Sequence, residues 1–310
     1  MSKEKVISIA AVMEKSGVNF GTSGVRGQVV DLSDEVCWAY AVGFIQYLQE
    51  TKQLQSGATV GIAGDYRTST DRMMGVLSQA IVDQGFEPVN LGKIPSPALA
   101  LYGLKHNMPT MMVTGSHIPE DRNGIKFNTA LGEILKPDEQ GIRAQVITIP
   151  AGKFTPGGAL VREPSLPPID GSAKAEYVRR YLNFFPKSAL QGLSIGLYEH
   201  SSVSRECLYE ILTGLGARVM LLGRTDAFIS VDTEAIRSED VALAAQWSKE
   251  HGFDCIISTD GDGDRPLISD EKGVWLRGDV AGIFCAQYLA ADAVITPVNC
   301  NSALELSNWF

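Results

Sequence analysis

The chain has 310 residues, 45% of them hydrophobic, and its 27 Lys and Arg against 36 Asp and Glu give a net charge of −9. This length predicts two or three domains, and the hydrophobic share excludes a chain that is disordered throughout. The acidic balance provides no broad basic face for a polyanion, so we expect no nucleic-acid partner. A local basic pocket for a small phosphate is compatible with it.

The cysteines and the apolar segments indicate the location of the protein. The five cysteines form no C-x-x-C pair and are scattered: Cys37, Cys207, Cys255, Cys285 and Cys300. This pattern favours reduced thiols in a cytosolic protein over a disulfide framework or a zinc site. The apolar segment Val6–Met13 is short, lacks a clear small-residue cleavage site and leads directly into Glu14 and Lys15, so we expect no signal peptide. No stretch approaches the roughly 18 apolar residues of a membrane span. We expect a soluble cytoplasmic protein without a membrane partner, and no pattern predicts its oligomeric state.

Helix and strand signals alternate along the first half. Residues 34–50 predict a helix, because Ser33 can cap it and Asp34 and Glu35 suit its first turn. Residues 59–63 predict a strand, followed by a helix that Gly85 ends and by short strands at 89–91 and 111–113. Both helices carry an apolar face, at Cys37, Ala41, Phe44 and Leu48 in the first and at Met73, Leu77, Ala80 and Ile81 in the second.

The second half repeats this layout. In each half a strand that begins at a glycine leads to a helix closed by a glycine, and a Leu-Gly pair follows seven residues later (Gly61, Gly85 and Gly92; Gly196, Gly216 and Gly223). The prolines of residues 155–171 indicate a linker between the halves. A helix is expected at 279–289 and a strand at 294–296. The fold class is therefore α/β, with consecutive similar modules, each a mixed, mostly parallel sheet between helices.

A first glycine-rich segment, Asn19–Gly27, has glycines at every third position and contains Arg26. Glycines let a backbone approach a ligand closely, and a guanidinium is a rigid fork for phosphate oxygens. The spacing matches neither the dinucleotide-binding nor the P-loop pattern. Taken alone, this segment is better interpreted as an ordinary surface turn.

A second segment, Thr114–Pro119, follows the strand expected at 111–113 and contains Ser116. A serine in this place lies at the carboxyl end of a sheet, where α/β sites form. Lys126 can return to the same pocket as a proton donor and acceptor, with a pKa lowered by burial or by neighbouring cations. A turn with a capping serine remains an equally good interpretation of this segment alone.

A third segment, Asp260–Arg265, follows an apolar run and places aspartates at alternate positions: Asp260, Asp262 and Asp264. Three such carboxylates can converge on one hard cation. An EF-hand competes, but Arg265 stands where its loop needs glycine, and a strand precedes the segment. A phosphatase with Asp260 as nucleophile and Asp262 as acid is a second alternative.

The three segments share a chemical logic. A Mg²⁺ ion held by the aspartates can polarise a phosphoryl group on the oxygen of Ser116. Arg26 and Arg265 can neutralise the equatorial oxygens, and Lys126 can carry the proton of a sugar hydroxyl. This combination suits phosphoryl transfer.

These segments resemble those of the α-D-phosphohexomutase superfamily, which includes phosphomannomutases, phosphoglucomutases and phosphoglucosamine mutases. Thr114–Pro119 is similar to the family's phosphoserine loop, Asp260–Arg265 matches its magnesium loop, and Phe20–Gly27 resembles its N-terminal signature. Residues 65–69 and 95–97 agree as well. The resemblance covers nearly the whole chain.

The resemblance implies a reversible exchange between hexose 1-phosphate and hexose 6-phosphate through a phosphoserine and a bisphosphorylated sugar. Ser116 would be the phosphoserine and would bind Mg²⁺ together with Asp260, Asp262 and Asp264. Lys126 would be the general acid and base, Arg26 and Arg265 would bind the substrate phosphate with it, and His117 would shape the loop. Among hexose phosphates we expect mannose phosphate.

The resemblance also implies a domain division: a first domain at 1–163, a second at 164–273, and the beginning of a third at 274–310. The family's serine loop commonly has alanine and asparagine where Gly115 and Ile118 stand. Its sugar-reading G-E-x-S-G-H loop and its fourth-domain phosphate loop do not occur among these residues. We therefore expect a truncated chain with impaired activity. A non-catalytic remnant that binds Mg²⁺ or a phosphosugar is the alternative.

Overall fold

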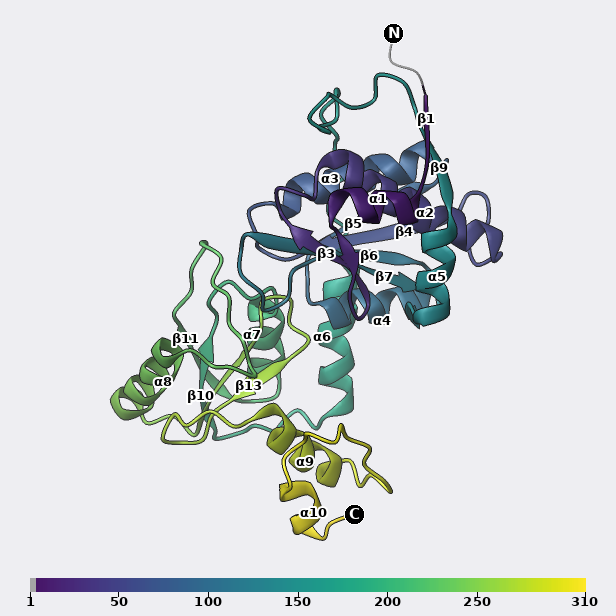
Figure 1. Cartoon of the computed structure of the whole chain (residues 1–310). Helices are drawn as coiled ribbons and strands as arrows, with labels where there is room; N and C mark the ends of the chain where they lie inside the picture. Colours follow the sequence, from purple (N-terminus) through teal and green to yellow (C-terminus); the bar gives the residue numbers. More distant parts are fainter. Residues whose placement is uncertain (1–3) are drawn as a thin grey trace.

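The computed structural model describes residues 4–310, so the first three residues of the predicted domain 1–163 lie outside the described residues. Two α/β units follow one another, and a short helical segment comes last (Figure 1). The first unit runs from β1 (Lys5–Ser8) to β9 (Val146–Ile149), and the second from α6 (Ser172–Phe184) to β13 (Pro266–Ile268). The predicted α/β fold of consecutive modules is confirmed, while the predicted domain boundaries stay predictions.

The sheet of the first unit has a parallel centre and an antiparallel flank. Its strand order is β2-β3-β7-β6-β4-β5, with β8 beside β7. The pairs β4–β5 and β4–β6 are parallel, and the pairs β6–β7 and β3–β7 are antiparallel. The strands are β2 (Asn19–Phe20), β3 (Gly24–Gln28), β4 (Thr59–Gly64), β5 (Glu87–Lys93), β6 (Thr110–Val113), β7 (Arg122–Thr129) and β8 (Gly132–Glu133).

Helices cover both faces of this sheet. The side chains of α1 (Ile9–Ser16), α2 (Asp34–Glu50) and α3 (Thr70–Asp83) form one core with Ile62 and Phe127. The opposite face packs on α4 (Ser96–His106) through Ala63 and Met112, because neighbouring strand residues point to opposite faces. At one side, α5 (Lys136–Ala144) precedes β9, which pairs with β1 in a separate two-stranded ladder.

The helix α2 has the bounds that its sequence predicts. The Ser33 hydroxyl accepts a hydrogen bond from the Val36 backbone N–H at 3.4 Å, and Asp34 and Glu35 lie in the first turn. The predicted apolar faces of α2 and α3 are buried, but burial of α2 extends around most of its circumference. Phe44 therefore packs into a core that Trp38 and Ile45 also enter from the same helix.

The second unit has the strand order β11-β10-β12-β13. The pairs β10–β11 and β10–β12 are parallel, and β12–β13 is antiparallel. The strands are β10 (Ser194–Tyr198), β11 (Arg218–Leu222), β12 (Cys255–Thr259) and β13. The helix α8 (Ser238–His251) packs on β12, while α6 and α7 (Arg205–Gly214) contribute to another core through Val178 and Ile211.

The two units repeat one arrangement. The strands β5, β4, β6 and β7 correspond to β11, β10, β12 and β13 in order and in pairing direction. The glycines that suggest the repeat in the sequence share a positive φ: Gly85 and Gly216, then Gly92 and Gly223. Such φ values are readily adopted by glycine alone. The β6–β7 turn with the serine and the β12–β13 turn with the aspartates therefore occupy the same place in the two units.

Two segments differ in detail from their sequence patterns. Residues 19–27, interpreted on their own as a surface turn, form a β-hairpin in which a turn joins β2 to β3. Two of its glycines serve packing, because a Cβ at Gly24 would lie 2.0 Å from the Ile125 carbonyl oxygen and one at Gly27 would lie 2.7 Å from Val18. Residues 294–296 form no strand, since no neighbouring strand among residues 4–310 offers them a ladder.

Beyond β13 the chain forms α9 (Gly278–Tyr288), close to the helix predicted at 279–289, and the short α10 (Ala303–Ser307) (Figure 1). The predicted linker, residues 155–171, has neither helix nor strand and runs along the first unit, where Asn90 donates to the Pro167 carbonyl at 2.8 Å. None of the helices within residues 4–310 has the length and apolar character needed to cross a bilayer.

His200 provides a test of the second unit's core. It follows β10, is 0% exposed, and its Nε2 lies 2.8 Å from the Thr259 carbonyl oxygen. Burial lowers its pKa from 6.5 to about 4, with Asp240 opposing and Arg237 and Arg205 assisting. As the pH falls, His200 is therefore protonated in the unfolded chain before it is protonated in the folded chain. The stability that the neutral, buried His200 contributes is therefore present above pH 6.5 and is lost progressively as the pH falls to about 4.

We expect the NMR ring resonance that His200→Gln removes to stay unchanged between about pH 7.5 and 5.5 in the native protein, since the folded imidazole remains neutral there. A titration of that resonance with a midpoint at the ordinary histidine pKa would contradict the buried position. The His106→Gln variant, at an exposed site, serves to separate the histidine signals.

Candidate functional site

The serine loop joins β6 to β7 and projects Ser116 toward the second unit. Ser116 is 1% exposed and has a φ of 54°, which is unusual for a residue other than glycine. Its backbone N–H donates to Thr114 Oγ1 at 2.8 Å, and its hydroxyl donates to Asp260 Oδ2 at 2.7 Å. The serine of one unit is thus in direct contact with the aspartate loop of the other.

The aspartate loop joins β12 to β13. Asp260 and Asp262 are buried and Asp264 is exposed, and one carboxylate oxygen from each lies within 4.8 Å of the others. The strand β13 returns antiparallel to β12, whereas an EF-hand loop would lead into a helix. The EF-hand interpretation is therefore excluded.

These carboxylates fit a Mg²⁺ ion. Asp262 Oδ1 is buried without a hydrogen-bond partner among the described residues, and an orphaned buried oxygen is costly unless a ligand satisfies it. Burial, followed by the Asp262 and Asp264 charges, raises the pKa of Asp260 far above its usual range. Oxygen ligands and a local excess of negative charge are what a hard divalent cation requires.

Lys126 on β7 connects the units by charge. Its ammonium donates to Asp262 Oδ2 at 2.8 Å and to Asp264 Oδ2 at 2.6 Å. Burial alone would lower the pKa of Lys126, but the two carboxylates outweigh it and raise the pKa. The expected lowering is therefore wrong, because the sequence pattern did not reveal that both partners are anions. Lys126 is held as an ammonium ion.

His117, Arg265 and Arg26 surround the serine less tightly. His117 Nδ1 lies 3.3 Å from Ser116 Oγ, and burial together with the charges of Arg265 and Arg26 lowers the pKa of His117. The Arg265 side chain pairs with Glu234 at 2.9 Å, while its backbone N–H donates to Asp260 at 3.2 Å. Arg26 lines a cavity together with Arg122. Their predicted roles stay predictions.

Three further residues belong to this region. Ser96, at the start of α4, donates its hydroxyl to Asp262 Oδ2 at 2.7 Å and its backbone N–H to the Asp262 carbonyl at 2.8 Å. Asp65 and Arg67, which follow β4, form a fully buried ion pair behind the serine loop. In the sequence, residues 65–69 and 95–97 are noticed only because they resemble the family's pattern, and that resemblance does not assign them a role.

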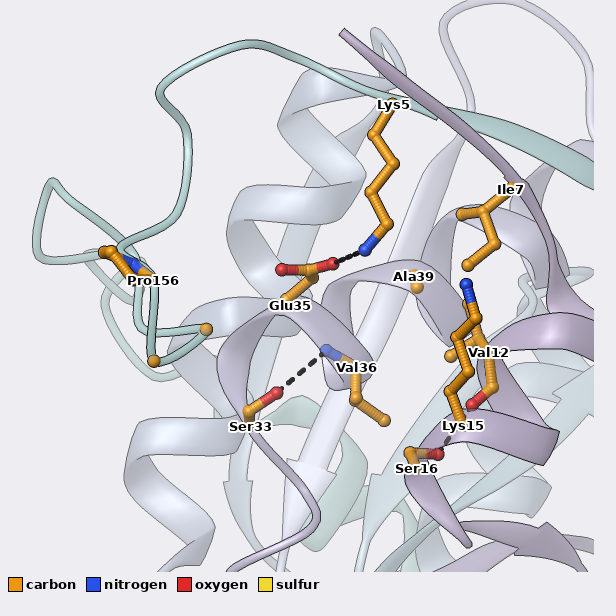
Figure 2. A pocket seen from close by; sticks show the side chains of 12 residues that line it. Lys5, Ile7, Val12, Lys15, Ser16, Ser33, Glu35, Val36, Ala39 and Pro156 are labelled. Atoms are coloured by element: carbon orange, nitrogen blue, oxygen red, sulfur yellow. Dashed lines mark hydrogen bonds and ion pairs between the residues drawn. The ribbon is translucent and has the colours of Figure 1, made fainter. Parts of the chain in front are cut away.

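A separate cavity of about 260 Å³ lies away from this site, between β1, α1 and α2 (Figure 2). Lys5 there pairs with Glu35 at 2.6 Å, and Ser33 caps α2. These groups are thus already paired. Lys15 and Ser16 also line the cavity, and the Ser16 hydroxyl donates to the Val12 carbonyl at 2.8 Å. We assign no chemistry to it.

Two family models match the chain. The model described as phosphoglucomutase/phosphomannomutase, alpha/beta/alpha domain I, matches residues 17–152, and the corresponding domain II model matches residues 175–273. Phosphomannomutases of Salmonella muenchen and Sinorhizobium fredii are both 44% identical to this chain, over 96% and 94% of it and over 60% and 61% of their own lengths. The chain thus spans about three fifths of these relatives.

Solved structures show the same fold. A putative phosphomannomutase from Thermus thermophilus aligns with a TM-score of 0.73 at 20% identity, over 93% of this chain and 66% of that one. A phosphoglucomutase/phosphomannomutase family protein from Burkholderia thailandensis aligns with a TM-score of 0.67 at 20% identity, over 92% of this chain and 60% of that one.

The orphaned carboxylate predicts the effect of one substitution. Asp262→Asn should weaken Mg²⁺ binding at least about tenfold in isothermal titration calorimetry, because it removes a charged oxygen from the cluster. Asp292→Asn, an exposed aspartate beyond α9, is the matched control and should bind as the native chain does. Equal Mg²⁺ affinity of Asp262→Asn and the native chain would contradict a cation site in this loop.

Proposed function

The chain belongs to the phosphoglucomutase/phosphomannomutase family, and from this premise we propose that it interconverts hexose 1-phosphate and hexose 6-phosphate through a phosphorylated Ser116. The observation that carries the proposal is the contact between Ser116 Oγ and Asp260 Oδ2 at 2.7 Å, with Lys126 bound to the same loop. A nucleophile, an ammonium ion and a cation site thus lie together at one interface, as phosphoryl transfer requires.

The site contains groups that accept the proton of the nucleophile and a group that donates a proton to the leaving oxygen. When Ser116 takes a phosphoryl group from a hexose bisphosphate, the new bond joins Ser116 Oγ to phosphorus and the sugar oxygen–phosphorus bond breaks. The serine proton has two acceptors in reach, Asp260 Oδ2 at 2.7 Å and His117 Nδ1 at 3.3 Å. The Lys126 ammonium gives its proton to the released sugar oxygen. In the reverse step these protons return.

The charges around the serine suit the transferred group. Mg²⁺, held by Asp260, Asp262 and Asp264 together with Ser116 Oγ, would supply electrostatic stabilisation of the phosphoryl oxygens. Arg265 belongs to the aspartate loop, where its backbone N–H donates to Asp260 at 3.2 Å, and in this proposal Arg26 and Arg265 bind the phosphate oxygens. A dianionic group placed there meets cations on several sides.

The substrate class follows from the relatives. Both of those reported at 44% identity carry the name phosphomannomutase, which favours mannose phosphates as substrates. We also propose a cytoplasmic enzyme, because scattered cysteines without a C-x-x-C pair favour reduced thiols.

Phosphate labelling tests the proposal. We expect the chain, incubated with a hexose 1,6-bisphosphate and MgCl₂, to acquire one phosphate on Ser116, located by peptide mass spectrometry. Ser116→Ala should remain unlabelled, because its nucleophilic oxygen is gone. Ser78→Ala, which removes a buried serine on α3 outside the site, should label normally.

The labelling also separates the competing interpretations. A phosphoserine resists hydroxylamine, whereas an acyl phosphate on Asp260 is cleaved by it. Hydroxylamine-sensitive label and phosphate release that persist in Ser116→Ala would identify a phosphatase that uses Asp260. Absence of label with retained binding of the bisphosphate would identify a non-catalytic binding protein.

A further inference from the structure

Arg67 is a fully buried cation whose guanidinium donates only to backbone carbonyls within residues 116–122 and to the carboxylate of Asp65. Its Nη1 donates to the carbonyls of Pro119 and Arg122 at 2.7 and 3.0 Å. Its Nη2 donates to the carbonyls of Ser116 and Ile118 at 2.9 and 2.5 Å. Its Nε donates to Asp65 at 3.2 Å, so all five guanidinium N–H groups are used.

Asp65 fixes the beginning of the same loop. Its Oδ2 accepts hydrogen bonds from the Thr114 hydroxyl at 2.9 Å and from the Gly115 backbone N–H at 3.3 Å. Its Oδ1 accepts from the Thr70 hydroxyl at 2.7 Å. The ion pair of Asp65 and Arg67, with both side chains 0% exposed, therefore binds both sides of Ser116.

This pair supports an unfavourable backbone conformation. Ser116 has a φ of 54°, and a non-glycine residue in that region needs compensation from its surroundings. The Arg67 guanidinium binds the carbonyl groups at and after Ser116, and it occupies the space beside Gly115. A Cβ there would lie 2.6 Å from Arg67 Cζ. The conformation that results directs Ser116 Oγ to Asp260.

The second unit covers this guanidinium with an aromatic ring. Arg67 Cζ lies 4.1 Å from the ring centroid of Phe228, on the segment between β11 and α8. A reciprocal contact places Arg205 of the second unit 4.4 Å from the ring centroid of Tyr66. The two arginines follow equivalent strands, β4 and β10, so each unit covers the arginine of the other.

We propose that Arg67, supported by Asp65 and covered by Phe228, is a positioning residue that holds Ser116 in the conformation needed for phosphoryl transfer. This inference rests on the proposed function. Arg67 acts through backbone carbonyl groups and does not touch the substrate. Lysine cannot replace it, because an ammonium lacks the planar fork that reaches four carbonyls and a carboxylate together.

Single-turnover labelling of Ser116 from a hexose 1,6-bisphosphate tests this role. In Arg67→Lys the transfer rate at saturating donor should fall by about a hundredfold, since a misplaced nucleophile loses about this factor. The donor concentration for half-maximal rate should stay within about threefold, because no donor contact is removed. Arg205→Lys is the matched control, since Arg205 is also buried and stacked on an aromatic ring, while its Nη1 donates to the carbonyls of His200 and Thr225 in the second unit. It should transfer at close to the native rate.

Several results would overturn the inference. One is native transfer in Arg67→Lys, another is an equal loss in Arg205→Lys, and a third is a change confined to the half-saturating concentration. An unlabelled native chain would contradict the proposed function instead. In that case amide hydrogen exchange tests the positioning role of Arg67. Faster exchange of residues 114–123 in Arg67→Lys, but not in Arg205→Lys, supports this role. Unchanged exchange in Arg67→Lys contradicts it.

Discussion

The crowding of three carboxylates at the end of β12 is the constraint on which the site depends. Two unit charges about 4 Å apart repel by about 4 kcal/mol at an effective dielectric constant of 20, so these aspartates need partners. The first unit supplies them: Lys126 forms two ion pairs, and the Ser96 and Ser116 hydroxyls each donate one hydrogen bond to a carboxylate oxygen. These contacts cross between the units, so they join the units and assemble the site at once. Among the buried carboxylate oxygens of the described residues, Asp262 Oδ1 has no hydrogen-bond partner and is available to a ligand.

The repeat explains why the turn with the serine nucleophile and the turn with the three aspartates face each other. The serine turn and the aspartate turn follow equivalent strands, β6 and β12, at the carboxyl ends of their parallel neighbours. Ligand sites in α/β sheets form at such ends. The nucleophile from one unit and the acidic loop from the other thus meet through equivalent parts of one fold. The reciprocal stacking of Arg67 on Phe228 and Arg205 on Tyr66 extends this symmetry behind the site.

Much of this arrangement is predictable where its cause is local. The helix α2 has the predicted bounds because Ser33 and the first-turn acids mark its start within a few residues. The glycine spacing indicates the repeat because each glycine has the positive φ that its turn needs. The aspartate spacing indicates a cation site because alternate side chains in one turn can converge.

Other features depend on residues far apart in the sequence and could not be predicted. Gly24 packs against Ile125 of β7, where a Cβ would lie 2.0 Å from the Ile125 carbonyl oxygen, and the glycine spacing alone does not indicate this partner. The pKa of Lys126 is raised, not lowered, by carboxylates more than a hundred positions away in the sequence. Phe228 has no motif at all and matters only because the units bring it onto Arg67.

Anomalous diffraction from crystals of the chain grown with Mn²⁺, as a substitute for Mg²⁺, tests the central claim most directly. The claim is that the two units form one phosphoryl-transfer site at their interface. It predicts a single anomalous peak among the carboxylates of Asp260, Asp262 and Asp264, with Ser116 of the first unit facing it. A peak bound elsewhere, or a serine loop turned away from the occupied aspartates, would contradict it.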